Sequence, residues 1–135
     1  MMCWSISSPP KAKYRLLYVG SDLGLMEFVQ EALKGEGWFV VRCPGGSTAH
    51  LLLSSGIRYD LLMFDEELMG TSGIELVRLA RSLEHRKRTP VILLSPKGGA
   101  AETWRAGARV FVRKPQPFQA VVEAVRHLLD SNDGK

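Results

Sequence analysis

Short runs of consecutive apolar residues alternate along the chain with longer stretches in which apolar residues recur at helical spacing. The clearest run, Leu61 to Phe64, is continuously apolar, which is typical of a strand buried on both faces of a sheet. Similar runs predict further strands at residues 16–19, 39–43, 91–94 and 110–112. Helical spacing predicts helices within residues 25–33, 49–53, 74–80, 100–106 and 118–129. This alternation predicts an α/β fold, a parallel sheet with right-handed crossovers and helices on both faces.

Capping and turn residues mark the ends of the predicted helices. Ser21 and Asp22 offer side-chain oxygens as N-caps for the first helix, and Ser47 offers one for the second. Glycines follow the first helix at positions 35 and 37, and we place the glycines at 70 and 73 in the turn before the third. These signals divide the chain into compact strand and helix units without a long linker.

The length of 135 residues predicts one domain, which we place at residues 14–130. Residues 1–13 are polar and aperiodic and are expected to form a disordered tail, and residues 131–135 a C-terminal tail or the stub of a linker. No apolar run approaches membrane-spanning length, the first residues lack the layout of a secretion signal, and Cys3 and Cys43 make no disulfide framework. We therefore expect no membrane contact and a cytoplasmic location.

Charge is distributed unevenly along the chain. Residues 1–80 carry 7 basic and 9 acidic side chains and residues 81–135 carry 11 and 5, so the net charge of +4 divides into −2 and +6. A basic C-terminal half suits an acidic partner or a nucleic acid, but a solvated surface of Lys and Arg is the more common explanation. Direct nucleic-acid binding is therefore kept only as an alternative.

Polar residues stand at the carboxyl ends of the predicted strands, where ligands and chemistry gather in an open α/β sheet. Asp65 follows the third strand, Ser95 the fourth and Lys114 the fifth, while Gly20 follows the first. Parallel strands bring these positions to one edge of the sheet. A carboxylate, a hydroxyl and an ammonium group are thus expected close together.

This constellation resembles the receiver domain of the response regulators of bacterial two-component signalling. The segments that carry the resemblance are F-D-E-E-L-M-G-T-S-G-I-E-L, P-V-I-L-L-S and V-R-K-P, and it covers about residues 15–130. It implies a flavodoxin-like, doubly wound sheet of five parallel strands in the order 2-1-3-4-5, as in the chemotaxis regulators. The fourth helix is shorter here than in typical members.

The resemblance implies a role for each residue at the sheet edge. Asp65 matches the aspartate that accepts a phosphoryl group, and Ser95 and Lys114 match the residues that contact this group. Ser95 and Phe111 match the switch positions, although phenylalanine lacks the hydroxyl that a switch tyrosine would use. The bond between Lys114 and Pro115 matches a cis-peptide site.

The chain departs from the family at the acidic pair that holds Mg²⁺, because Gly20 and Ser21 occupy these positions. The remaining metal ligands are Asp65, the backbone of Glu67 and Asp22, which lies one residue late. Mg²⁺ requires a near-octahedral shell of hard oxygens. Two alternatives would supply an oxygen: Asp22 swings inward, or a side chain of Glu66 or Glu67 turns toward the metal. We expect no cofactor, with Mg²⁺ only if this altered site still binds it.

These residues predict a signalling module and not an enzyme. We expect a degenerate receiver that works without phosphorylation and binds a protein partner, a histidine kinase or an effector, through its fourth helix, fifth strand and fifth helix, and that can form a homodimer. Without metal or phosphate, Asp65 and Lys114 would pair directly and stiffen the sheet. The alternatives are an active phosphoacceptor with an altered Mg²⁺ site, and a basic module associated with nucleic acid.

Overall fold

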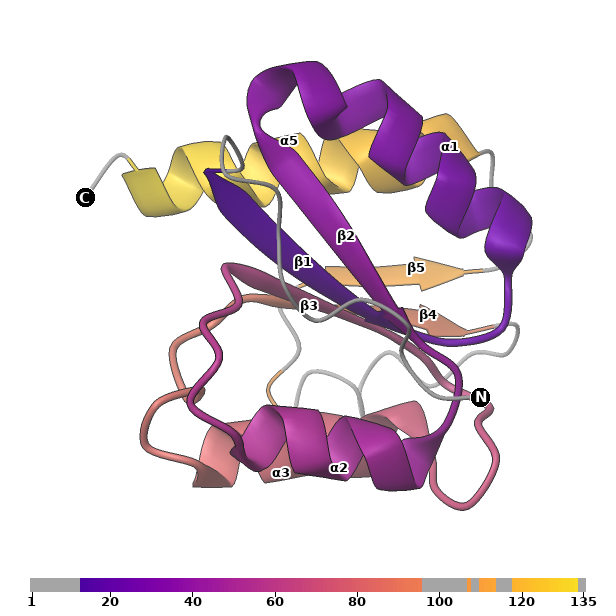
Figure 1. The fold of residues 1–135 in the computed structure, drawn as a ribbon, viewed down its shortest axis with the longest axis vertical. Coiled ribbons are helices and arrows are strands. Elements are labelled where there is room, and N and C mark those ends of the chain that lie inside the picture. Colours follow the sequence, from indigo (N-terminus) through magenta and orange to yellow (C-terminus); the bar gives the residue numbers. More distant parts are fainter. Residues whose placement is uncertain (1–12, 96–106, 108–109, 114–117, 134–135) are drawn as a thin grey trace.

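The fold is a five-stranded parallel sheet with the strand order β2-β1-β3-β4-β5, as predicted (Figure 1). A computed structural model describes residues 13–95, 107, 110–113 and 118–133 of the chain. The strands lie close to their predicted positions: β1 (Tyr14–Val19), β2 (Trp38–Cys43), β3 (Leu61–Asp65), β4 (Val91–Ser95) and β5 (Val110–Arg113). The flavodoxin-like architecture expected from the sequence is confirmed.

The described helices connect these strands on the two faces of the sheet. They are α1 (Leu23–Leu33), followed by a short 3₁₀ turn η1 (Lys34–Glu36), then α2 (Gly46–Ser54), α3 (Gly73–Ser82) and α5 (Phe118–Asp133). Our shortened fourth helix, at residues 100–106, and the expected tail up to residue 12 lie outside the described residues. No described helix has the length and apolar character needed to cross a membrane.

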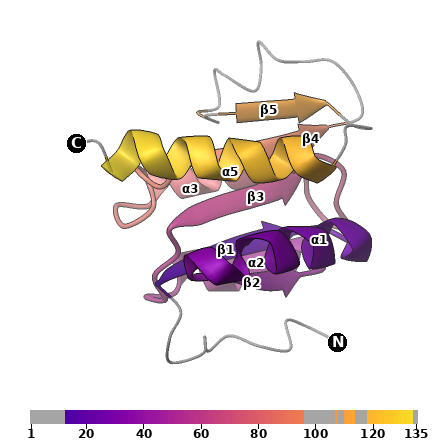
Figure 2. The ribbon, with the colours of Figure 1, turned by 90° about the horizontal axis from the view of Figure 1, so that it is seen from above.

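Two apolar layers enclose the sheet because successive strand residues point to opposite faces. Leu16 and Tyr18 pack with α1 and α5, whereas Leu17 and Val19 pack with α2 and α3. Figure 2 shows α1 and α5 side by side on their face of the sheet. All residues of β3 are buried, so this strand forms the centre of the core.

The helix ends confirm one predicted cap and correct another. Asp22 is the N-cap of α1, and its Oδ1 accepts a hydrogen bond from the Leu25 N–H at 3.0 Å. Ser47 is not the cap of α2, because the helix already begins at Gly46. A Cβ atom at Gly46 would lie 2.4 Å from Cγ2 of Thr71, so close packing against the loop before α3 favours glycine as the first residue of this helix.

The later helices also differ from the prediction at their ends. Ser72 caps α3 by accepting a hydrogen bond from the Glu75 N–H at 3.2 Å, so Gly73 is the first residue of the helix and not part of the turn. Gly70 does lie in the turn, with a φ of +85°. The last helix continues to Asp133, beyond the domain end expected at residue 130.

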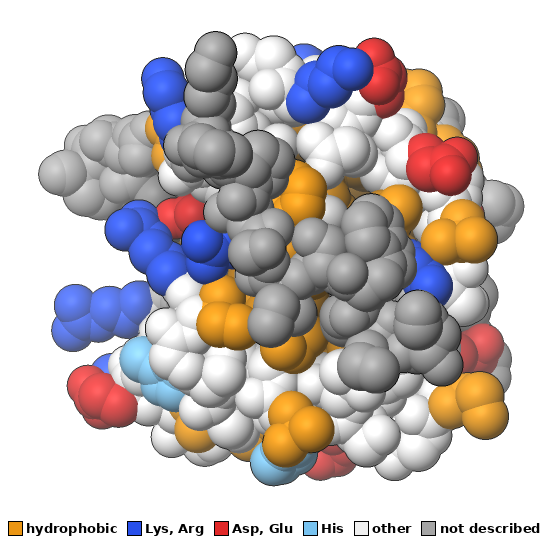
Figure 3. Space-filling view, in the orientation of Figure 1, with side chains coloured by type: hydrophobic (Ala, Val, Ile, Leu, Met, Phe, Trp, Pro, Cys, Tyr) orange, Lys and Arg blue, Asp and Glu red, His pale blue; other side chains and the backbone are white. Residues whose placement is uncertain are grey.

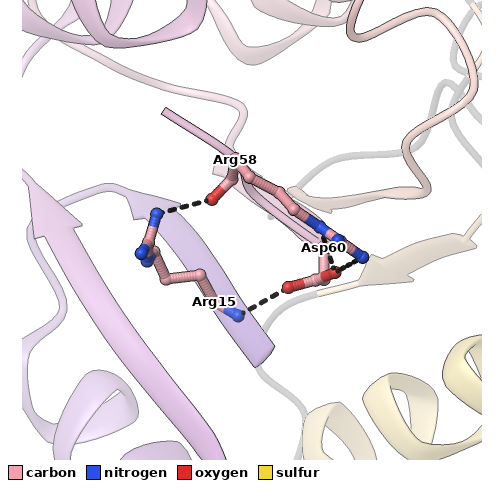
Figure 4. Close-up of polar contacts among 3 residues, drawn as sticks. All are labelled: Arg15, Arg58 and Asp60. Carbon is pink, nitrogen blue, oxygen red and sulfur yellow. Dashed lines mark hydrogen bonds and ion pairs between the residues drawn. The ribbon is translucent and has the colours of Figure 1, made fainter. Parts of the chain in front are cut away.

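A polar clasp joins the beginnings of β1 and β3 (Figure 4). The Asp60 N–H donates to the Arg15 carbonyl at 2.8 Å, and Oδ2 of Asp60 accepts from the Arg15 N–H at 2.8 Å. Arg58 donates to Oδ1 of Asp60, and Nη1 of Arg15 donates to the Arg58 carbonyl at 3.1 Å. Together these bonds fix the first residues of β3 against the edge of β1.

Candidate functional site

The candidate site lies where β1, β3 and β4 end. Asp65 is the last residue of β3 and Ser95 the last residue of β4, and they are 6% and 3% exposed. Asp65 is paired in register with Leu94, so Ser95 stands one residue further along the neighbouring strand. The structure therefore brings Asp65 and Ser95 to adjacent strand ends, as the sequence predicts.

Tyr18 is the residue of this site that the sequence did not reveal. Its hydroxyl oxygen lies 3.2 Å from Oδ1 and 3.1 Å from Oδ2 of Asp65, and it donates its proton to this carboxylate. The same hydroxyl accepts a hydrogen bond from the Asp22 N–H at 3.2 Å. Tyr18 is fully buried. The Tyr18 side chain thus lies in the apolar layer between the sheet and helices α1 and α5, and its hydroxyl contacts both oxygens of Asp65 at the carboxyl end of β3.

The Tyr18 hydroxyl stays neutral in this environment. Burial raises the pKa of Tyr18 well above its ordinary value, and the negative charge of Asp65 raises this pKa further. Tyr18 is consequently a hydrogen-bond donor to Asp65 at neutral pH.

Gly20 leaves the room that this contact needs. A Cβ atom at Gly20 would lie 2.4 Å from the Tyr18 hydroxyl oxygen and 2.4 Å from Oδ2 of Asp65. Any side chain at this position would therefore collide with the hydrogen-bonded pair. Gly20 is also one of the two positions at which the receiver resemblance places a metal-binding acid. The Tyr18 hydroxyl thus occupies space that a carboxylate at position 20 would need.

The Asp22 carboxylate proposed as a replacement has another role, and hydrogen bonds hold the backbones of Glu66 and Glu67. The Asp22 carboxylate caps α1, as described above. The Glu67 side chain is exposed, and its backbone pairs with Ser72 in an isolated bridge. The Glu66 backbone is bonded on both sides: its N–H donates to the Leu94 carbonyl at 2.7 Å and its carbonyl accepts from the Gly73 N–H at 2.9 Å. Asp22 therefore does not swing inward in this structure.

The described residues do not fit an Mg²⁺ site. Mg²⁺ requires several hard oxygen ligands and is usually held by one or two carboxylates together with phosphate and water. Within the described ranges, no three His, Cys, Asp or Glu side chains gather so that they could hold a metal ion. The group nearest Asp65 in the place of a second acid is the neutral hydroxyl of Tyr18.

Some predicted site residues lie outside the described part of the chain. These are Lys114 and Pro115, so the ion pair of Lys114 with Asp65 and the cis-peptide bond stay predictions. Phe111 lies in β5, in register with Leu93 of β4, and its role as a switch residue also stays a prediction.

Replacing Tyr18 with phenylalanine should lower the free energy of unfolding by about 1–2 kcal/mol, because Asp65 remains buried and loses a donor. Urea unfolding at neutral pH measures this loss. Tyr14→Phe is the matched control, since Tyr14 lies in the same strand but is half-buried and packs its ring against Trp38. Equal effects of the two substitutions would contradict a specific bond between Tyr18 and Asp65.

Alkaline titration should give the same tyrosinate absorbance for the natural chain and Tyr18→Phe between about pH 9 and about pH 11. The folded-state pKa of Tyr18 is raised above its ordinary value of 10.0. The stability that this hydroxyl contributes is thus fully present below about pH 10 and is lost only as the pH rises through the folded-state pKa. A reduced absorbance change in the variant within this window would show that Tyr18 ionises normally.

Comparison with known proteins supports the family suggested by the sequence. The DNA-binding response regulator MtrA of Mycobacterium tuberculosis is 30% identical over 124 residues, which cover 90% of this chain and 53% of MtrA. The transcriptional regulatory protein ResD of Bacillus subtilis is 28% identical over 120 residues, which cover 85% of this chain and 48% of ResD. The chain therefore spans about half the length of these curated relatives. No protein-family model matches the chain.

Solved structures of receiver domains have the same fold. A CheY-like receiver domain from Methanospirillum hungatei superposes with a TM-score of 0.78 at 22% identity, covering 90% of this chain and 97% of the other. The HemR receiver domain from Leptospira biflexa superposes with a TM-score of 0.72 at 27% identity, covering 85% and 93%. The receiver domain of the sensor histidine kinase PA1611 from Pseudomonas aeruginosa, which has a coordinated magnesium ion, gives a TM-score of 0.71 at 23% identity, covering 86% and 97%. With its sheet order, its strand-end aspartate and these relatives, the chain belongs to the response regulator receiver domain family of two-component signalling.

Proposed function

We propose that this receiver domain signals without phosphorylation of Asp65, by binding a protein partner. The observation that carries the proposal is the hydrogen bond from the Tyr18 hydroxyl to both oxygens of Asp65, beside a glycine with no room for a side chain. Receiver domains interact with histidine kinases and effectors, and the family membership of this chain supports a partner of that kind.

The chemistry of phosphoryl transfer explains why this contact opposes it. A carboxylate oxygen must attack the phosphorus atom, and a metal ion together with cationic groups must offset the charge of the transferring group. Here the Tyr18 proton holds both oxygens of Asp65, which lowers their reactivity as nucleophiles. The space beside Asp65 in which an acid at position 20 would hold the metal is filled by the same hydroxyl.

The surface that meets the partner is proposed to include α5, β5 and the fourth helix, with a second copy of the chain as a further occupant. The helix α5 supports part of this proposal, because it packs its apolar side on α1 and the sheet and leaves Gln119, Glu123 and His127 exposed. The partner is a histidine kinase or an effector, and Mg²⁺ has no role in its binding.

Amide spectra of the ¹⁵N-labelled chain during titration with Mg²⁺, and then with beryllofluoride in the presence of Mg²⁺, test the proposal. We expect the amide signals of Tyr18, Asp65 and Ser95 to stay in place, as in the control variant Asp65→Asn. A saturable change that depends on Mg²⁺ and is lost in Asp65→Asn would overturn the proposal. It would favour an active phosphoacceptor whose metal is held by Asp22 or Glu66 after rearrangement.

A further inference from the structure

A pocket lies at the amino ends of β3 and β4, the opposite end of these strands from Asp65. It has a volume of about 550 Å³ and opens between the connection from α2 to β3 and the connection from α3 to β4. Residues 56–60 line one side, and Glu84, His85, Arg86, Arg88, Thr89 and Pro90 line the other. Figure 3 shows Lys and Arg side chains gathered at the left of the molecule, the side on which these connections lie in Figure 1. This volume is within the range of small-molecule sites.

Arg86 is the buried cation of this pocket. Its residue is only 2% exposed. Its Nε donates to the Leu53 carbonyl at 2.9 Å, and its Nη2 donates to the carbonyls of Leu52 at 3.2 Å and Ser55 at 3.0 Å. The guanidinium carbon lies 4.9 Å from the centre of the Tyr59 ring. The guanidinium group therefore caps the C-terminus of α2, where partial negative charge accumulates.

These contacts leave part of the Arg86 charge for another group. Nη1 of Arg86 has no hydrogen-bond acceptor among the residues that the structure describes, and no described carboxylate forms an ion pair with this side chain. The described groups that stabilise the charge of Arg86 are backbone carbonyls at the end of α2 and the face of the Tyr59 ring. A buried cation is usually paired with an anion, and Arg86 is a residue of the pocket wall.

The two carboxylates in the lining are already engaged with other cations. Asp60 accepts hydrogen bonds from Arg58 at 2.9 Å and from the backbone of Arg15 at 2.8 Å. Glu84 pairs with Lys87 at 3.0 Å. Two cations of the lining, Arg86 and the exposed Arg88, form no ion pair with a residue that the structure describes.

His85 is a further residue of the pocket lining. Its Nε2 lies 2.8 Å from the Ser55 carbonyl, which can only accept, so this nitrogen carries a proton. Its contact holds the rim of the pocket against the end of α2. The positive charges of Arg86 and Arg88 in the lining therefore suit an anion.

We propose that this pocket binds a small oxyanion, a carboxylate or phosphate group of a small molecule, with Nη1 of Arg86 as the inner contact and Arg88 at the rim. The planar guanidinium fork matches both groups, which form charge-assisted hydrogen bonds with it. The proposal does not rest on the function proposed above, because the pocket and Asp65 lie at opposite ends of the strands.

Amide spectra of the full chain during titration with sodium phosphate or sodium citrate test this site, with sodium chloride at equal ionic strength as the reference. We expect saturable shifts at residues 56–60 and 84–90 with at least one oxyanion and not with chloride. The comparison of phosphate with citrate shows which group the pocket prefers. Arg88→Gln should weaken the affinity about threefold, the scale of one exposed charge pair.

Two controls make the outcome specific. Lys34→Gln removes an exposed charge from the 3₁₀ turn after α1 and should leave the affinity unchanged, as should Asp65→Asn. Equal shifts with chloride, or an affinity that Arg88→Gln and Lys34→Gln reduce to the same extent, would overturn the proposal. Arg86→Lys should weaken binding further than Arg88→Gln, and if this variant fails to fold, Arg88→Gln and the chloride reference still decide.

Discussion

The triple variant Tyr18→Val, Gly20→Asp, Ser21→Asp should bind Mg²⁺ at least about tenfold more tightly than the natural chain. Valine at position 18 removes the Tyr18 hydroxyl, and the Asp65 carboxylate, released from that hydrogen bond, can turn away from the new Cβ atom at position 20, which would otherwise lie 2.4 Å from its Oδ2. The two new aspartates stand at the positions of the family's acidic pair, next to Asp65 at the end of β3. Three carboxylates at one edge provide the hard oxygens that Mg²⁺ requires. Isothermal titration calorimetry with Mg²⁺ measures the change.

The single substitution Gly20→Asp separates the effect of space from that of charge. With Tyr18 in place, the Cβ atom of the new aspartate would lie 2.4 Å from the Tyr18 hydroxyl oxygen. We therefore expect this variant to be destabilised by about 2–3 kcal/mol and to gain no Mg²⁺ affinity. Gly20→Ala introduces the same collision without the charge and is the matched control. Mg²⁺ binding by Gly20→Asp alone would show that the Tyr18 side chain moves away readily and does not block the site.

Replacing Arg86 with methionine should lower the free energy of unfolding by about 3 kcal/mol. The substitution removes the donors to three carbonyls at the end of α2, those of Leu52, Leu53 and Ser55. It also removes the cation over the Tyr59 ring. Methionine keeps much of the side-chain volume, so the loss reports mainly on the polar contacts. Urea unfolding at neutral pH measures it.

Arg88→Met is the control for this substitution. Arg88 is exposed two residues further along the same connection, so the control should change stability by no more than about 0.5 kcal/mol. A loss below about 1 kcal/mol for Arg86→Met would mean that water replaces the guanidinium group at the end of α2.

The strand positions could be predicted from the sequence because apolar runs and helical spacing report directly on burial, whereas the order of the strands followed only from the resemblance to receiver domains. Asp65 and Ser95 could be placed at the same edge, since parallel strands end together. The predicted start of α2 is wrong because Ser47 is a good local cap, whereas the helix begins at Gly46, which packs closely against Thr71 from another part of the chain. Local patterns do not contain such packing.

The role of Tyr18 is not predicted by its local sequence, because Tyr18 lies within an apolar run, L-L-Y-V, that indicates core packing. A signal was nevertheless present. A buried tyrosine usually needs a hydrogen-bond partner for its hydroxyl. The residue two positions later, on the same face, is a glycine in place of an expected acid, and it leaves room for that hydroxyl at the end of the strand. These two residues together indicate the contact with Asp65, whereas neither does so alone.

The clasp of Arg15, Arg58 and Asp60 has a consequence for the far end of the sheet. A slip of β3 by one residue against β1 would turn Asp65 away from the face on which Tyr18 lies. The bonds of Asp60 to Arg15 at the start of both strands oppose such a slip. Three residues near the beginning of the strands thus fix the register that the contact between Tyr18 and Asp65 requires at the carboxyl ends. The position of Asp65 in the candidate site therefore depends on side chains that are not part of that site.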